Sequence, residues 1–423
     1  MPLNLASPGI VVREVDLTVG RVDTASDKVG ALVGPFAKGA VDLPILVETE
    51  QDLLNAFGKP YSADKHYEYW MTASSYLAYG GPLRIVRADD DDLKNAFSGT
   101  AGSIKIKSTE HYNDLGYDGS TITGVTVAAR NPGSWANNLK VAIIDDIADQ
   151  VLTFSSLPTN INVGYGITQG VPANTVVAGS GSTSLLTGYF KGIVTQIDTN
   201  LKQVSVKILE SVTNAGVSTS VNYQPNGIYK FGNTAVAIHT SGQSSSYTTG
   251  TPSASVDWFD QQTIQLTNST INWNNIAERP GTSSFAAARD ARFDEVHVVV
   301  IDDVGEVTGN AGTILEKHLS LSKAKDGEYS LGSPSYWRKY TYNNSTNIFA
   351  GGAPAGIVTT SFGAGATNFT QFADGGWDQN AQGIRYSGIG ATTLTLGGGK
   401  NYDGGTNDAV SYTHLTLPTT TPV

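Results

Sequence analysis

The sequence predicts a multidomain fold that combines a small α/β domain with larger all-β parts. Glycine occurs 47 times in 423 residues, next to many Thr, Ser and Val, which is typical of strands joined by tight turns. Two helical patterns and three strand patterns lie close together in residues 27–96. Charged residues make up only 15% of the chain and Tyr occurs 19 times, unlike the composition of a disordered protein.

Residues 1–26 are predicted to form an extended arm and a linker. Pro8 and Gly9 break the chain at its start. A β-branched strand follows, made of Gly9, Ile10, Val11, Val12, Arg13, Glu14 and Val15. Residues 16–26 are polar and have no periodicity. A strand separated from its domain in this way must pair with a sheet, either in its own domain or elsewhere.

Residues 27–96 are predicted to form the small α/β domain. Strands are expected at residues 29–34, 44–48 and 83–88, and helices at about residues 49–57 and 64–79. In the first helix, Leu53, Leu54 and Phe57 form the apolar face and Gly58 ends it. This arrangement of short strands and amphipathic helices predicts a compact unit.

Residues 97–290 are predicted to be mostly β, with a surface insertion at about residues 155–255. The expected strands are residues 122–129, 139–144, 185–193, 204–209, 228–231 and 263–266. Turn residues separate them, and the insertion is rich in Thr, Ser, Gly and Val. The region therefore has the pattern of a surface β domain inserted into a better-packed frame.

Residues 291–409 are predicted to form a partial α/β domain. Residues 293–301 are an almost continuous apolar run, which suggests a strand buried on both faces, as in a parallel sheet. A loop at residues 305–309 should lead into a helix. The residues expected on that helix are Ile314, Leu315, His318 and Leu319.

Charge and composition exclude several classes of protein. The formal net charge is −11 and no run of Lys and Arg occurs, so the chain lacks the basic surface that nucleic-acid binding requires. It has no cysteine, which excludes disulfides and thiolate chemistry and fits a reducing compartment. The first nine residues do not resemble a signal peptide. No apolar stretch approaches the roughly 20 residues that span a bilayer.

Motifs for cofactors and metals are weak, and we expect neither. Residues 396–401 resemble a phosphate-binding loop, but its first Gly is missing and Asn401 stands where Ser or Thr must reach magnesium. Residues 388–390 lack the third Gly of a dinucleotide-binding fingerprint. The histidines have no metal-ligand spacing, and His297 and His318 are expected to be satisfied core residues. The six are His66, His111, His239, His297, His318 and His414.

Two acidic clusters are the sharpest candidates for chemistry. Residues 89–92 are four consecutive Asp, which could bind a divalent cation. Calcium loops instead alternate their ligands with Gly, so a solvated strand boundary is the preferred interpretation. Asp302 and Asp303 follow a buried strand, where α/β enzymes place catalytic groups. No partner for them is visible, and no Gly-x-Ser-x-Gly motif supports a Ser-His-Asp triad.

Five blocks of sequence, in order, resemble contractile phage tail sheath proteins of the myovirus type. They are residues 7–16, 30–40, 57–60, 80–87 and 130–141. The first contains the Pro-Gly strand, and the fourth is a helix end followed by a strand bearing Arg. The fifth is similar to the family's Pro-Gly-x-Trp-Gly-Asn-x-Leu signature, with Ala136 in place of the usual Gly. A longer run, residues 257–340, is similar to the version found in phages of marine cyanobacteria.

The resemblance implies a structural protein and not an enzyme. Sheath subunits of this family stack as hexameric rings around a tail tube, and contraction of the sheath drives the tube through the host envelope for genome ejection. The implied partners are other copies of the chain, the tail tube protein, and the baseplate and tail terminator proteins. Assembly in the host cytoplasm and a place in the virion are implied, with no nucleic acid and no membrane insertion. Residues 291–409 would then be part of a subtilisin-like domain that is not a working protease.

The resemblance also gives the N-terminal arm a role. An exposed strand adds to a neighbour's sheet through backbone hydrogen bonds, and head-to-tail addition of this kind builds rings or helices. The linker would let rigid bodies slide while they stay tethered, and a switch in packing would release strain stored in the lattice. The β insertion is expected to face outward.

The chain departs from the family near its C-terminal end. In the family, the chain continues beyond residue 409 into a domain that packs on the tube and receives the neighbour's arm. We expect this domain to be missing here, and residues 410–423, which resemble translated sequencing adaptor, to be non-native. Residues 1–409 alone are therefore expected not to form a sheath.

Two other classes of function stay open. A β-rich adhesin or carbohydrate-binding surface protein would fit the Gly, Thr and aromatic content. A hydrolase that uses Asp302 or Asp303 is the third possibility. The five ordered blocks favour the sheath protein over both.

Overall fold

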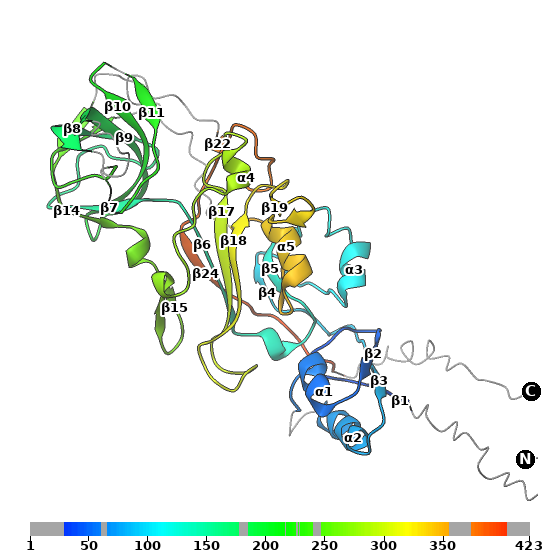
Figure 1. Cartoon of the computed structure of the whole chain (residues 1–423). Helices are drawn as coiled ribbons and strands as arrows, with labels where there is room; N and C mark the ends of the chain where they lie inside the picture. Colours follow the sequence, from blue (N-terminus) through cyan, green and yellow to red (C-terminus); the bar gives the residue numbers. More distant parts are fainter. Residues whose placement is uncertain are drawn as a thin grey trace, which may run out of the picture.

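The computed structural model describes residues 29–60, 66–176, 185–215, 217–225, 227, 229–239, 247–354 and 374–403. Figure 1 shows three parts in a row: a small unit of helices and strands, a central body of layered sheets, and a curled sheet at the far end. The fold is mixed α/β and mostly β, as the composition predicts. No helix in the described residues is long and apolar enough to cross a membrane.

The small unit contains the strands and helices predicted for it. Its strands are β1 (Gly30–Gly34), β2 (Pro44–Val47) and β3 (Leu83–Arg87), and its helices are α1 (Glu50–Phe57) and α2 (His66–Ala78). The sheet order is β1-β3-β2, with β1 parallel and β2 antiparallel to β3. The side chains of Thr49 and Asp52 form a capping box that starts α1, and Gly58 ends it at a φ of 79°.

The central body contains two sheets that share an apolar core, and a second core lies on the other face of the larger sheet. The first sheet has the order β18-β17-β6-β24 and the second β21-β5-β4. These strands are β4 (Phe97–Gly99), β5 (Val125–Ala129), β6 (Leu139–Asp145), β17 (Glu295–Asp302), β18 (Thr313–Ser322), β21 (Ile348–Ala350) and β24 (Ala391–Thr395). The helices α3 (Thr109–Asp114) and α5 (Trp337–Asn344) and the short helix η1 (Ser134–Ala136) complete it. Val127, Val141, Val298 and Trp337 are among the buried core residues.

The parallel sheet and the helix predicted after residue 301 are wrong. β17 pairs antiparallel with β6 and with β18, and residues 313–322 form strand β18. Both faces of β17 are buried because the sheet lies between two cores: Val298 contributes to one and Val299 to the other. An antiparallel strand covered on both sides has the same apolar pattern as a parallel one.

Irregular pairing explains why β18 resembles a helix in sequence. The register with β17 shifts between Val300 and Ile301, which leaves Leu315 without a partner, and shifts again between Val296 and Val298. Ser320, beside the second shift, has a φ of 51°. These bulges interrupt the alternation of apolar and polar residues that identifies a strand.

The curled sheet comprises the strands between residues 150 and 257, in the order β13-β12-β8-β9-β10-β7-β14, with β11 paired to β10. The strands are β7 (Gln150–Phe154), β8 (Gly166–Val176), β9 (Leu185–Asp198), β10 (Gln203–Thr213), β11 (Ser218–Ser220), β12 (Val236–His239), β13 (Tyr247–Gly250) and β14 (Pro252–Asp257). Thr251 alone joins the two edge strands, so β14 continues from β13. Because β13 pairs with β12 and β14 pairs with β7, the sheet curls into a near-barrel. Phe231, predicted in a strand, lies in a loop and fills its core.

Short elements connect the larger parts. They are η2 (Phe259–Gln261), β15 (Thr263–Gln265), β16 (Thr270–Asn272), η3 (Trp273–Asn275), α4 (Ser284–Ala287), β19 (Glu328–Ser330), β20 (Ser333–Pro334), β22 (Asp374–Gly375) and β23 (Arg385–Tyr386). The predicted arm, the linker and residues 410–423 lie outside the described residues.

Candidate functional site

The two Asp residues after β17 have structural roles. The carboxylate of Asp302 accepts hydrogen bonds from the backbone N–H groups of Gly305, Val307 and Thr308, at 2.7 to 3.1 Å, and so shapes the loop that follows the strand. Asp303 accepts hydrogen bonds from the backbone N–H and the hydroxyl of Thr267. Asp303 also pairs with the ammonium of Lys140 at 3.1 Å, so both carboxylates are engaged by neighbouring groups of the fold.

The run at residues 89–92 is only half solvated, so the predicted solvated boundary is wrong for its first two members. Asp89 lies 2.5 Å from the ammonium of Lys105 and 2.7 Å from that of Lys107. Asp90 is buried and accepts a hydrogen bond from the backbone N–H of Leu93 at 2.7 Å. Asp91 and Asp92 are exposed. Within the described ranges, no group of His, Asp and Glu has the arrangement of a metal site.

The histidines of the central body are satisfied within the fold. In β17, Nδ1 of His297 accepts a hydrogen bond from the Ser320 backbone N–H, and Nε2 donates to the Glu278 carbonyl, both at 2.9 Å. Burial lowers the pKa of His297, in agreement with a neutral ring. His318 is also buried, but on a strand and not on a helix, and its Nε2 lies 2.9 Å from Glu316 Oε2.

The Gly-rich loop at residues 396–401 is a packing element. The carbonyl of Gly397 accepts a hydrogen bond from the Phe97 N–H at 2.9 Å. A Cβ at Gly399 would collide with the carbonyl of Gly133, so only glycine allows the two loops to touch. The Asn401 side chain accepts a hydrogen bond from the Ser134 N–H at 2.9 Å. The loop thereby fixes residues 130–138, which carry the Trp signature.

Arg87 is the centre of the junction between the small unit and the central body. It ends β3 and is 1% exposed. Its guanidinium donates to four backbone carbonyls, at 2.7 to 3.2 Å. Three of these carbonyls belong to the small unit, at Phe36, Ala37 and Gly39. The fourth is that of Pro132, in the loop of residues 130–138. One buried cation therefore satisfies the turn after β1 and ties it to the central body.

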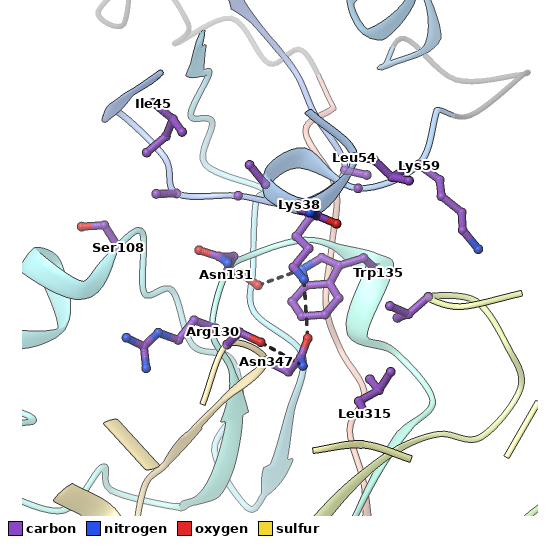
Figure 2. A pocket seen from close by; sticks show the side chains of 18 of the residues that line it. Lys38, Ile45, Leu54, Lys59, Ser108, Arg130, Asn131, Trp135, Leu315 and Asn347 are labelled. Carbon is purple, nitrogen blue, oxygen red and sulfur yellow. Dashed lines mark hydrogen bonds between the residues drawn. The ribbon is translucent and has the colours of Figure 1, made fainter. Parts of the chain in front are cut away.

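Lys38 makes a second contact across this junction. Its ammonium lies 4.5 Å from the centre of the Trp135 ring, a cation–π geometry. It also donates a long hydrogen bond, 3.5 Å, to the side-chain oxygen of Asn347 (Figure 2). Burial lowers the pKa of Lys38, although the charge of Glu316 opposes the shift.

Glu316 in β18 organises the loop on the far side of that contact. Its carboxylate accepts hydrogen bonds from Ser345, from Thr346 and from both the backbone and the side chain of Asn347. Burial alone would raise the pKa of Glu316, but these bonds and His318 outweigh it and lower the pKa to about 2. Glu316 thus holds Asn347 in the position from which it meets Lys38.

We expect Glu316→Gln to remove an acid-sensitive part of the stability. Because the folded-state pKa lies below the ordinary value of 4.5, the contribution of Glu316 is present above pH 4.5 and is lost as the pH falls toward 2. After allowance for solvent screening of a partly exposed group, the variant should lose about 2 kcal/mol at pH 6 and little near pH 2.5. Urea unfolding at both pH values measures this. The exposed Glu48→Gln is the control, and equal losses at the two pH values would contradict the assignment.

A cleft of about 870 Å³ opens beside this junction, between the small unit and the central body (Figure 2). Leu43, Ile45 and Leu54 give it an apolar wall on one side, and Val307 and Leu315 on the other. All five side chains are half-buried. Lys38 projects into the cleft. The acidic residues that line it, Glu110 and Glu306, are exposed. The cleft therefore combines two apolar walls with the ammonium of Lys38.

A second polar junction fixes the curled sheet on the central body. Its cations are Lys207 of β10 and Arg279; Lys207 lies 2.7 Å from Asp146, and Arg279 lies 3.4 Å from Asp146 and 2.5 Å from Asp257. Asp149 is 3.7 Å from the Lys207 ammonium and accepts a hydrogen bond from the Ile208 N–H. The chain enters the curled sheet just after Asp149 and leaves it at Asp257. The charged side chains therefore lie around the two chain segments that connect the curled sheet to the central body. Sequence reasoning missed this site because its members are up to 133 residues apart.

Asp149 should make the junction pH-dependent. Burial raises its pKa to about 6, although the charge of Lys207 opposes the shift. A raised folded-state pKa means that folding favours the protonated form, so stability falls as the pH rises from 3.8 to 6. We expect the unfolding free energy of the wild type, relative to Asp149→Asn, to drop by at most about 3 kcal/mol between pH 4 and pH 7. Urea unfolding across this range measures it. A difference that stays constant with pH would contradict the shift.

The predicted arm strand at residues 9–15 lies outside the described residues, and its role in joining subunits stays a prediction. Three of the other blocks singled out in the sequence meet in the fold. Arg87 of the fourth block and Trp135 of the fifth belong to the junction, and so does Lys38 of the second.

Three curated phage proteins are similar to part of the chain. The tail sheath protein of Enterobacteria phage T4 is 36% identical over 102 residues, which are 24% of this chain and 15% of that protein. The tail sheath protein of Vibrio phage KVP40 is 38% identical over 92 residues, 21% of this chain and 13% of that protein. The tail sheath protein of Salmonella phage ViI is 30% identical over 118 residues, which are 27% of this chain and 18% of that protein. The chain therefore matches only 13% to 18% of the length of these relatives.

The other comparisons add little. No protein-family model matches the chain. A solved structure of a sheath tail protein from Listeria innocua is 14% identical, with a TM-score of 0.17, over 54% of this chain and 34% of that one. This likeness is too weak to carry a structural argument. The curated relatives show distant homology to phage tail sheath proteins over part of the chain.

Proposed function

We propose that the chain is a structural subunit of a contractile phage tail sheath, of the type found in phages of cyanobacteria. In this proposal it polymerises with other copies of itself into stacked hexameric rings around the tail tube. Contraction then drives the tube through the host envelope. The single observation that carries the proposal is the similarity to the tail sheath proteins of three phages, at 30% to 38% identity.

The physical character of the junctions supports a mechanical role. Arg87, through buried polar contacts, and Arg279, through part-buried ones, each join separate parts of the fold. Such contacts are directional and have few alternative arrangements, so they suit parts that carry load as rigid bodies. The candidate acids Asp302 and Asp303 are used to shape loops, and this agrees with a protein that works by packing.

The proposed partners follow from the same role. They are the tube, the baseplate and terminator proteins and, through the strand at residues 9–15, the neighbouring sheath subunits. The curled sheet lies at the end of the molecule away from the small unit (Figure 1), and in the proposal it faces outward from the tail. The virion is the proposed location, after assembly in the host cytoplasm.

Immunogold electron microscopy tests this function. Antibodies raised against the purified chain are applied to phage particles that carry this sequence, before and after contraction is triggered. The gold should cover the tail sheath along its length, and the labelled zone should become shorter and wider on contraction. Gold confined to tail fibres would favour the adhesin instead, and gold on the capsid would refute both.

A further inference from the structure

A rigid hairpin beside α5 presents an apolar tip to solvent. It consists of β19 and β20, joined by Leu331 and Gly332. Leu331 is 98% exposed and Tyr329 is 48% exposed, the former being the most exposed large apolar residue in the described part of the chain. A rigid tip of this kind keeps apolar surface in contact with water, which is unfavourable unless a partner covers it.

The hairpin is held in place, so its tip cannot fold away. The Tyr329 hydroxyl donates to the carbonyls of Leu319 and Ser320, at 3.3 and 3.0 Å. The Tyr329 ring meets that of Tyr340 edge-on at 6.0 Å between their centres. The Ser335 N–H donates to the Gly327 carbonyl at 2.9 Å and closes the base of the hairpin.

The cleft beside the Arg87 junction has complementary chemistry. Its walls are half-buried apolar side chains, and Lys38 in its interior has one hydrogen bond within the described residues, the long one to Asn347. Lys59 at its edge makes one similarly long contact, 3.5 Å, to the Glu306 carbonyl. On the hairpin, Glu328 is half-buried and begins β19. A carboxylate next to an apolar tip matches an ammonium next to an apolar wall.

The cleft and the hairpin are separate features of the same chain, because no residue that lines the cleft belongs to the hairpin. We propose that the hairpin at residues 328–334 of one copy inserts into the Lys38 cleft of the next copy, with Leu331 against Ile45 and Leu54 and with Glu328 facing Lys38. A tip and a hollow at different places on one molecule form a head-to-tail contact, which extends into a ring or a helical array. The inference rests on the proposed self-assembly and names a contact for it that does not involve the arm.

Disulfide cross-linking tests this contact, because the chain has no cysteine of its own. Copies carrying Leu331→Cys are mixed with copies carrying Ile45→Cys and are oxidised gently. The covalent mixed dimer should form about tenfold faster than in a matched mixture of Leu201→Cys and Ile45→Cys. Leu201 is a fair control because it is 60% exposed, in the turn between β9 and β10. Equal rates in the two mixtures would overturn the proposal.

A charge exchange between copies tests the polar half of the contact. In the same cysteine pairs, Lys38→Glu in the cleft copy, or Glu328→Lys in the hairpin copy, should slow cross-linking about tenfold. Combining both changes should restore the rate, since the opposite charges meet again. A combined pair as slow as either single change would refute the assignment of Glu328 to Lys38. If immunogold labels the sheath but the cross-link does not form, the proposed contact is refuted and the sheath function is not. If the cross-link forms but the sheath is not labelled, the sheath function is refuted and the contact is not.

Discussion

Replacing Arg87 with alanine should destabilise the chain by about 4 kcal/mol, because four buried carbonyls lose their only shared donor. Those of Phe36, Ala37 and Gly39 follow β1 in the small unit, so that unit should lose order first. The Pro132 carbonyl also loses its bond to Arg87, which releases the loop that carries Trp135. Urea unfolding followed by tryptophan fluorescence measures the loss, because Trp135 and Trp70 report the two sides of the junction.

Arg84→Ala is the matched control for this change. Arg84 lies on the same strand, three residues before Arg87, but its side chain is exposed. Its loss should cost no more than about 0.5 kcal/mol. Arg87→Lys should recover only a small part of the stability, since an ammonium cannot reproduce the planar fork that reaches the carbonyls on both sides. If Arg84→Ala and Arg87→Ala lost similar amounts, the junction would not depend on the buried guanidinium.

Local signals in the sequence were enough to predict the small unit. Helix α1 has a Thr cap at residue 49, an acid three residues later and a Gly after its last turn, and these signals act within a few residues of one another. The prediction of a helix in place of strand β18 was wrong because two bulges in the pairing with β17 interrupt the alternation of apolar and polar residues. The strand predicted at Phe231 was wrong as well, because the burial of Phe231 depends on how the distant strands of the curled sheet close around it.

The candidate site was predictable only in pieces. Lys38, Arg87 and Trp135 each lie in a block that resembles the sheath family, yet the sequence did not show that the three meet. Asn347, the partner of Lys38, is 309 residues away in the chain and lies in a stretch with no distinctive pattern. Contacts of this range depend on the packing of whole sheets, and a single sequence contains no local signal for them.

The charges around Arg279 give the second large prediction, because they combine three carboxylates with two cations at a place that is mostly shielded from water. Removing the guanidinium with Arg279→Met leaves Asp146, Asp149 and Asp257 with Lys207 alone. Uncompensated buried charge of this kind costs about 3 to 5 kcal/mol, so the curled sheet should detach from the central body in much milder denaturant. Urea unfolding at pH 8 measures the loss, and hydrogen exchange at residues 146–149 shows whether it is local.

Acid should partly rescue this variant, and the rescue separates charge from packing. The charge of Arg279 lowers the pKa of Asp149, which is about 6 in the wild type, so Arg279→Met should raise this pKa. As the pH falls from 8 toward 5, the variant then takes up the proton before the wild type does, and its excess negative charge decreases. The deficit of Arg279→Met relative to the wild type should therefore shrink by about 1 to 2 kcal/mol over that range. Arg289→Met is the control: Arg289 stacks on Phe285 at 3.5 Å, away from these acids, and its loss should be small and independent of pH. A deficit for Arg279→Met that is equally large at both pH values would mean that Arg279 acts through packing and its bonds to backbone carbonyls, and not through the carboxylates.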